Sequence, residues 1–282
     1  MDREWKIGLS TIGEDGYRDD KTLQSAKEAG VDVLEMSFAP ASKLFQIGIS
    51  RYAEQLRQAG LELWSVHIPF WPHDPAHPEE EQRKSSVHCI KGLLDEISKA
   101  GVKIAVLHAG LEEDYEATRR QRLEQCKRSL KELADYAKPL GVTLCVEDLP
   151  RDCIGNTIVE LQELLAVDET LAVAFDTNHL LQDDPVAFVR AFGKKIKTLH
   201  VSDYDFVDER HWLPGEGKVD WPSLVAALRQ VGYRGPWLYE IHRPPESTIQ
   251  RERDLTFADF VANARACMNG QTPAPVGVPK RS

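Results

Sequence analysis

Acidic residues and a histidine in this sequence follow apolar runs, each at the point where the run ends. Glu147 follows Leu-Cys-Val, Asp176 follows Val-Ala-Phe, His200 follows Thr-Leu, and Glu240 follows Trp-Leu-Tyr. An ionisable side chain beside a buried run is costly unless it is paired, hydrogen-bonded or bound to a metal. Three carboxylates and one imidazole that converge make a competent divalent-cation site with room for substrate oxygens. Without a metal the carboxylates would repel one another, and one would have to stay protonated.

Each of these residues also has a simpler interpretation when it is taken alone. Glu147 could form a salt bridge with Arg151 or Lys197, and a single histidine such as His67 is more often hydrogen-bonded than a ligand. Asp176 could cap the turn that follows it, because Asp is a common turn former. Separate structural causes would not place Glu, Asp, His and Glu after four successive runs, so the joint pattern favours a metal site.

The elements that must position these residues are short β-rich runs separated by helical patterns. The predicted strands are Lys6–Ser10, Val31–Phe38, Leu61–Pro69, Val102–Ala109, Val142–Asp148, Leu171–Thr177, Ile196–Ser202 and Pro236–Ile241. Amphipathic stretches such as Glu79–Ala100 and Thr118–Leu140 lie between them, and the last helix is predicted over Asp254–Met268. Glycines that supply the left-handed end of a helix precede five of the runs, at Gly30, Gly60, Gly101, Gly141 and Gly232.

Alternating β–α units of this kind predict one α/β domain, a (β/α)₈ TIM barrel with outer helices. A doubly wound open sheet is the alternative, but no GxGxxG follows the first strand to support it. Residues that do chemistry lie at the carboxyl ends of barrel strands, so the candidate ligands should meet at one mouth. We expect the barrel over residues 1–270 and a flexible Gly- and Pro-rich tail over 271–282.

Composition and charge limit the compartment and the partners. The formal net charge of −10 argues against nucleic acid as the main partner. The five cysteines are scattered without a CxxC pair, which argues against a disulfide framework and favours a reducing cytosol. No apolar stretch approaches the roughly 20 residues that span a bilayer, and the charged start lacks a signal-peptide core. We therefore expect a cytoplasmic protein with no membrane partner, and the sequence leaves a homo-oligomer open.

Seven motifs occur in a characteristic order along nearly the whole chain. They are SVHIPF (65–70), LHAG (107–110), VEDLP (146–150), AFDTNH (174–179), LHVSD (199–203), HWLPGEGKVDWPSL (211–224) and GPWLYEI (235–241). Together they resemble the xylose isomerase-like TIM-barrel superfamily, the sugar phosphate isomerases and epimerases that also include endonuclease IV. The most specific parts are DTNH, LHVSD and the PGEG loop with the helix that follows it.

The resemblance to the ketose epimerase branch, represented by the d-tagatose epimerases, implies a set of site residues. One divalent metal (Mn²⁺, Mg²⁺, Co²⁺ or Zn²⁺) would be held by Glu147, Asp176, His200 and Glu240. The two glutamates would also form the acid/base pair on opposite faces of the substrate. The substrate-binding residues would be His67, His108, His179 and His211. Asp148 and Asp203 are interpreted as loop residues that support the site.

The chemistry expected of this site is proton removal from a carbon beside a carbonyl, through an enediolate that the metal stabilises. Return of the proton makes an isomerase or epimerase of a small sugar or keto-sugar, phosphorylated or not. The same intermediate can expel water or CO₂, so a lyase (dehydratase or decarboxylase) on a keto-sugar or cyclitol is the alternative. A phosphate would need a cradle, for which the PGEG loop and Lys218 are candidates, although ordinary loop chemistry explains them equally well.

Two weaker alternatives remain from the same resemblance. The endonuclease IV branch holds three zinc ions, and Glu209-Arg210-His211 resembles its D-R-H motif with Glu in place of Asp. That departure, the acidic net charge and the lack of a DNA-binding insertion count against a zinc-dependent phosphodiesterase. A non-catalytic sugar-binding protein is disfavoured because all four of the implied ligands are present.

Overall fold

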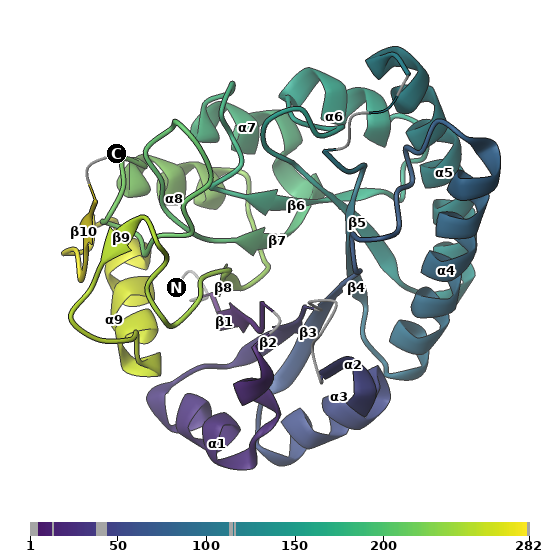
Figure 1. Ribbon diagram of the computed structural model, residues 1–282. Coiled ribbons are helices and arrows are strands. Elements are labelled where there is room, and N and C mark those ends of the chain that lie inside the picture. The colour runs from purple at the N-terminus through teal and green to yellow at the C-terminus, as the bar shows by residue number, and fades with distance from the viewer. Residues whose placement is uncertain (1–4, 13, 38–43, 113–114, 116, 281–282) are drawn as a thin grey trace.

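The computed structural model describes residues 5–280 except for 13, 38–43, 113–114 and 116. Its strands form an inner ring and its helices an outer ring (Figure 1). The strands of the ring are β1 (Ile7–Ser10), β2 (Val33–Met36), β3 (Glu62–His67), β4 (Ile104–His108), β5 (Thr143–Glu147), β6 (Ala172–Asp176), β7 (Ile196–His200) and β8 (Trp237–Tyr239). The α-helices are α1 (Asp20–Ala29), α2 (Leu44–Ile47), α3 (Ile49–Gln58), α4 (Glu80–Lys99), α5 (Arg119–Leu140), α6 (Ile158–Leu165), α7 (Pro185–Phe192), α8 (Trp221–Gln230) and α9 (Phe257–Met268).

The eight strands are parallel and lie in chain order, β7-β6-β5-β4-β3-β2-β1-β8. A parallel bridge between Val201 and Tyr239 joins the two outermost strands, and Val201 N donates to Leu238 O over 2.8 Å. The expected TIM barrel is therefore confirmed. Within the described part of the chain, no helix has the length and apolar character needed to cross a lipid bilayer.

Each predicted strand is present, although most are shorter than the apolar run that marked them. Val31, Leu61 and Val102 precede their strands because their N–H groups close the preceding helices, at 3.0, 2.9 and 3.2 Å from carbonyls five residues earlier. These residues are still buried, so periodicity alone cannot separate them from the strand. Phe38, the last residue of the second predicted strand, lies outside the described residues. The five helix-end glycines all have positive φ, as predicted.

Side chains alternate along the strands, and this period of two aims the site residues into the barrel. A small buried cluster consists of residues at every second position of β4, β5 and β6, namely Ile104, Val106, Cys145, Ala172 and Ala174. The residues between them, such as Leu107, Val146 and Phe175, pack in the larger core. The next inward-facing position of each strand, at its carboxyl end, is occupied by His108, Glu147 and Asp176 respectively.

Residues 271–280 pack on the barrel, which differs from the expectation of a flexible tail. β10 (Val278–Pro279) pairs antiparallel with β9 (Ile249–Gln250), and Gly277 N donates to the buried carboxylate of Glu216 over 2.6 Å. Figure 1 shows this pair beside α9. The composition of the segment did not indicate these contacts, because its partners lie tens of residues earlier in the chain.

Candidate metal centre and active site

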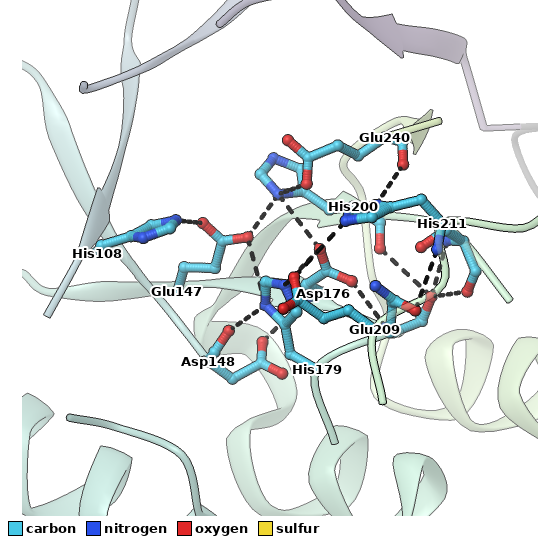
Figure 2. A network of polar contacts seen from close by, with 12 residues as sticks. His108, Glu147, Asp148, Asp176, His179, His200, Glu209, His211 and Glu240 are labelled. Atoms are coloured by element: carbon cyan, nitrogen blue, oxygen red, sulfur yellow. Dashed lines mark hydrogen bonds and ion pairs between the residues drawn. The ribbon is translucent and has the colours of Figure 1, made fainter. Parts of the chain in front are cut away.

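Four side chains from successive strands meet at the carboxyl end of the barrel. Glu147 ends β5, Asp176 ends β6, His200 ends β7, and Glu240 follows β8. One ligand atom from each residue lies within 4.8 Å of the other three, and all four residues are buried. Figure 2 shows their side chains pointing toward one another. The structure thus brings together the four residues that the sequence singled out.

His200 presents one ring nitrogen to the carboxylates, while the other is held from behind. Its Nδ1 lies 2.7 Å from Glu147 Oε1 and 3.3 Å from Glu240 Oε2. Its Nε2 lies within hydrogen-bond distance of Glu35 Oε2 on β2, at 3.2 Å, and Ser65 Oγ donates to the same oxygen over 2.7 Å. A histidine that binds a metal through one nitrogen usually donates its other N–H to such a partner. The local geometry therefore suits metal binding through Nδ1.

Glu35 is a site residue that sequence reasoning missed. It lies inside the apolar run Val-Leu-Glu-Met and not after its end, so a search of strand ends passed over it. The side chain is fully buried. The signal that could have found it is an ionisable residue inside a strand predicted to be buried, since such a residue needs a partner.

Asp176 has one satisfied and one unsatisfied carboxylate oxygen. Oδ1 accepts the N–H of Asn178 over 2.7 Å, which is the turn cap considered from the sequence, but Oδ2 is buried without a hydrogen-bond partner. Burial, opposed by His179 and reinforced by Glu240 and Glu147, raises the pKa of Asp176 to about 7. A buried carboxylate oxygen without a partner is costly, and a bound cation would remove that cost. The donor set therefore fits a divalent metal.

Bound protons reduce the electrostatic repulsion among the carboxylates when no metal is bound. Burial acts to lower the pKa of His200, but the charges of Glu240, Glu35 and Glu147 raise it well above its ordinary value. Burial likewise acts to raise the pKa of Glu147 and Glu240, but the charge of His200 lowers both below their usual range. The expected mutual repulsion of the carboxylates is thus relieved by protons on His200 and, below pH 7, on Asp176.

The second oxygen of Glu147 is bound by two further histidines. His67 Nε2 lies 3.0 Å and His108 Nε2 lies 3.1 Å from Glu147 Oε2. Figure 2 shows Glu147 between His108 and the other candidate ligands. The salt bridge to Arg151 or Lys197 considered from the sequence is wrong, because Lys197 Nζ donates to a main-chain carbonyl and Arg151 pairs with other carboxylates.

His179 and His211 converge on Glu209 beside the cluster. His179 Nε2 lies 3.2 Å and His211 Nε2 lies 3.7 Å from Glu209 Oε1. Nδ1 of each ring lies within hydrogen-bond distance of a main-chain carbonyl oxygen, at 2.8 and 3.0 Å. Both imidazoles are therefore fixed from two sides and face the same space.

A guanidinium pairs with Oε2, the other carboxylate oxygen of Glu209. Arg151 pairs with Glu209, with Glu112 over 2.7 Å and with Asp208 over 2.9 Å. Among the described residues, both groups that could hold a metal share Glu147 and His200, which indicates one centre. A further zinc on Glu209 would lie next to a paired guanidinium, so the geometry counts against a three-zinc cluster.

A cavity of about 500 Å³ opens at this mouth, within the size range of small-molecule sites. Its lining includes His67, His108, His179, Glu209, His211 and Glu240. Glu240 is 8% exposed, whereas Glu147 is fully covered. Phe70 and Trp71 form an apolar wall of the cavity and are 44% and 56% exposed. Trp64 packs in the barrel interior and Trp212 is buried, so neither contributes to that wall.

The two loop aspartates and the PGEG loop have structural contacts. Asp148 Oδ1 accepts the N–H of Asp176 over 2.8 Å. Asp203 accepts the N–H groups of Gly215 and Val219 over 2.8 and 3.1 Å, and the indole N–H of Trp221 over 2.9 Å. The described lining of the cavity includes none of residues 214–218, so this loop and Lys218 do not form a phosphate cradle there.

Comparison with known proteins adds a family and several relatives. The family model described as xylose isomerase-like TIM barrel matches residues 23–258. The fructoselysine 3-epimerase of Escherichia coli O157:H7 is 25% identical over 245 residues, covering 82% of this chain and 88% of the relative. The D-psicose 3-epimerase of Ruminiclostridium cellulolyticum is 25% identical over 228 residues, covering 77% and 76%. A solved D-tagatose 3-epimerase-like protein has the same fold, with a TM-score of 0.78, 22% identity and coverage of 94% and 96%.

Proposed function

The chain belongs to the xylose isomerase-like TIM-barrel family, and we propose that it is a metal-dependent epimerase or isomerase of a small sugar or keto-sugar. The observation that carries the proposal is the convergence of three carboxylates and one imidazole at a mouth with a sugar-sized cavity. The relatives named as 3-epimerases of fructoselysine and D-psicose, and one named as an inosose isomerase, support the reaction class.

The proposed metal ligands are Glu147, Asp176, His200 through Nδ1, and Glu240. Their oxygen-rich set suits Mn²⁺, Mg²⁺, Co²⁺ and Zn²⁺. A divalent ion there would supply the positive charge that stabilises an enediolate. The orphaned Oδ2 of Asp176 and the Glu35 contact behind His200 support this assignment.

Glu240 and Glu147 are the proposed acid/base pair. Glu240 reaches the cavity, so its carboxylate can take a proton from a carbon beside a carbonyl. Glu147 lies beneath His67 and His108, which hold its Oε2 and leave Oε1 directed at His200. His179 and His211 also line the cavity and would orient substrate hydroxyls.

Turnover of a sugar panel tests the proposed function. The purified protein should interconvert epimers or aldose–ketose pairs of at least one ketose or keto-sugar, lose that activity on chelation and regain it with a divalent ion. Release of water or CO₂ from the same panel would identify a lyase instead. Metal-dependent cutting of abasic-site DNA without sugar turnover would contradict the proposal.

Metal affinity is expected to fall as the pH drops below 7. Asp176 carries a proton below its pKa of about 7, and that proton must leave before the carboxylate can bind a cation. One displaced proton weakens binding by about tenfold per pH unit, and the proton on His200 adds to the effect. Titration calorimetry below and above pH 7 should show this trend, with protons released on binding. An affinity independent of pH would contradict the ligand assignment.

Glu35→Ala is expected to weaken metal binding by about 10–100-fold while the fold is retained, because outer partners of a ligating histidine have effects of this size. The variant leaves Nε2 of His200 without its acceptor, Glu35 Oε2. Glu35→Gln keeps an oxygen for that N–H and should lose less. Glu163→Ala, on the outer helix α6, is the control. Wild-type affinity in Glu35→Ala would show that Glu35 does not position His200.

A further inference from the structure

We propose that residues 271–280, here called the C-terminal strap, position the loop between β7 and α8 that carries Glu209 and His211 into the cavity. The loop comprises residues 201–220, and the strap contacts it through a hydrogen bond from Gly277 to Glu216. The inference rests on the proposed function for the role of His211 in binding substrate. It assigns a positioning role to residues that do not line the cavity.

The main junction between strap and loop is the buried carboxylate of Glu216. Arg251 binds it through two nitrogens, at 3.0 and 2.6 Å, and neither side chain is exposed. Gly277 N from the strap donates to Oε1 over 2.6 Å, and Leu213 N from the loop donates to Oε2 over 2.8 Å. Leu213 is two residues from His211, so strap and loop share one charged acceptor close to the cavity.

Close packing makes the junction specific to glycine. A Cβ at Gly277 would lie 2.6 Å from Cγ of Arg251, and a Cβ at Gly215 would lie 2.2 Å from the carbonyl oxygen of Pro273 in the strap. On the other side, Lys280 N donates to Thr248 O over 2.9 Å. The strap is thus in contact with both the loop and the segment after β8.

The loop needs such support because His211 is held in an unusual conformation. Its φ of 48° lies in the left-handed region, which non-glycine residues rarely adopt unless the surroundings fix it. The next residue, Trp212, donates its indole N–H to Thr248 Oγ1 over 2.9 Å. Thr248 also accepts the N–H of Lys280 in the strap, so one residue contacts both the strap and the loop beside His211. Within the described part of the chain, no hydrogen bond or ion pair joins the strap to the proposed metal ligands, which lie at strand ends. Loss of the strap should therefore affect substrate binding and leave metal binding intact.

Two truncated proteins test this inference. One ends at Gly270 and lacks the whole strap; the other ends at Lys280 and keeps every contact above. The first should bind metal as the full chain does but have a KM raised by about tenfold or more, since loss of one charge-assisted hydrogen bond has this magnitude. Its kcat should change much less, because the lost contacts act on binding and not on the reacting carbon. The second should match the full chain.

Amide hydrogen exchange gives a readout that does not depend on activity. Residues 205–217 should lose protection in the protein that ends at Gly270, while the strand ends keep theirs. If that protein fails to fold, Gly277→Ala takes its place, because its Cβ would displace the strap from Arg251. Arg251→Ala should lose protection of residues 205–217, whereas Arg251→Lys, which keeps a cation beside Glu216, should retain most of it.

The outcomes separate this inference from the proposed function. An unchanged KM together with unchanged protection of residues 205–217 would overturn the positioning role. Loss of metal along with the strap would also overturn it, since the strap would then support the whole barrel mouth. If the full chain turns over no sugar, the proposed function fails, and the protection of residues 205–217 alone decides whether the strap positions the loop.

Discussion

Glu240→Gln and Glu147→Gln are each expected to reduce sugar turnover by about 10³-fold, within the range that positioned acids and bases contribute. Glutamine keeps the size of the side chain and an oxygen that can bind a metal, but an amide cannot relay a proton. The effect should fall on kcat, because proton transfer occurs only in the chemical step. Steady-state kinetics on the accepted sugar, with metal content measured in the same samples, checks this expectation.

The two variants should also differ from each other. In the proposed mechanism each glutamate serves one side of the reacting carbon, so each variant should be more deficient with one epimer than with the other. Glu163→Gln provides a matched control, because this residue is on the outer helix α6 and pairs with Arg120 and Lys127. Wild-type kcat in either active-site variant with metal bound would remove that glutamate from the acid/base pair.

Asp176→Asn is expected to weaken metal binding by at least about a hundredfold, beyond the usual effect of losing an outer partner, and to abolish turnover. Asparagine can still accept the N–H of Asn178 at Oδ1, so the turn should survive. The change removes one of three clustered carboxylates, and the metal-free variant should therefore be at least as stable as the metal-free wild type. His200→Ala should lose metal as well.

Elemental analysis and thermal unfolding with and without metal measure both effects. The wild-type chain should retain about one ion, as one four-residue centre implies. Asp135→Asn is the control, since this side chain lies on the outer helix α5 and is 61% exposed. Unchanged metal content in Asp176→Asn and His200→Ala would refute the ligand assignment, and three tightly bound zinc ions would favour a nuclease-like centre.

The barrel and the convergence of Glu147, Asp176, His200 and Glu240 at its mouth were predictable because both follow from local patterns. Strands buried on both faces read as continuous apolar runs, and a run that ends in Glu147 or Asp176 places an ionisable residue at the barrel mouth. The alternation of inward and outward residues then fixes where those side chains point, as the series Ile104, Val106 and His108 shows.

The features that were not predicted depend on pairings between distant segments. Glu35 stands out locally only as an ionisable residue inside an apolar run. Its partner His200 is 165 residues later in the chain, and no local pattern identifies that pairing. The order of residues 271–280 depends on Glu216, which is buried with Arg251. A segment rich in glycine and proline is typical of disorder. It becomes ordered when a buried acceptor elsewhere in the chain binds its N–H groups.

Deuterium exchange from D₂O tests the central claim most directly, because it detects proton transfer even where the equilibrium hides net turnover. Metal-loaded protein, incubated with a panel of ketoses and keto-sugars and followed by NMR, should introduce deuterium at the carbon beside the carbonyl of at least one sugar. Metal-free protein and Glu240→Gln should not. Absence of exchange into every sugar, together with metal-dependent cutting of abasic-site DNA, would contradict the account.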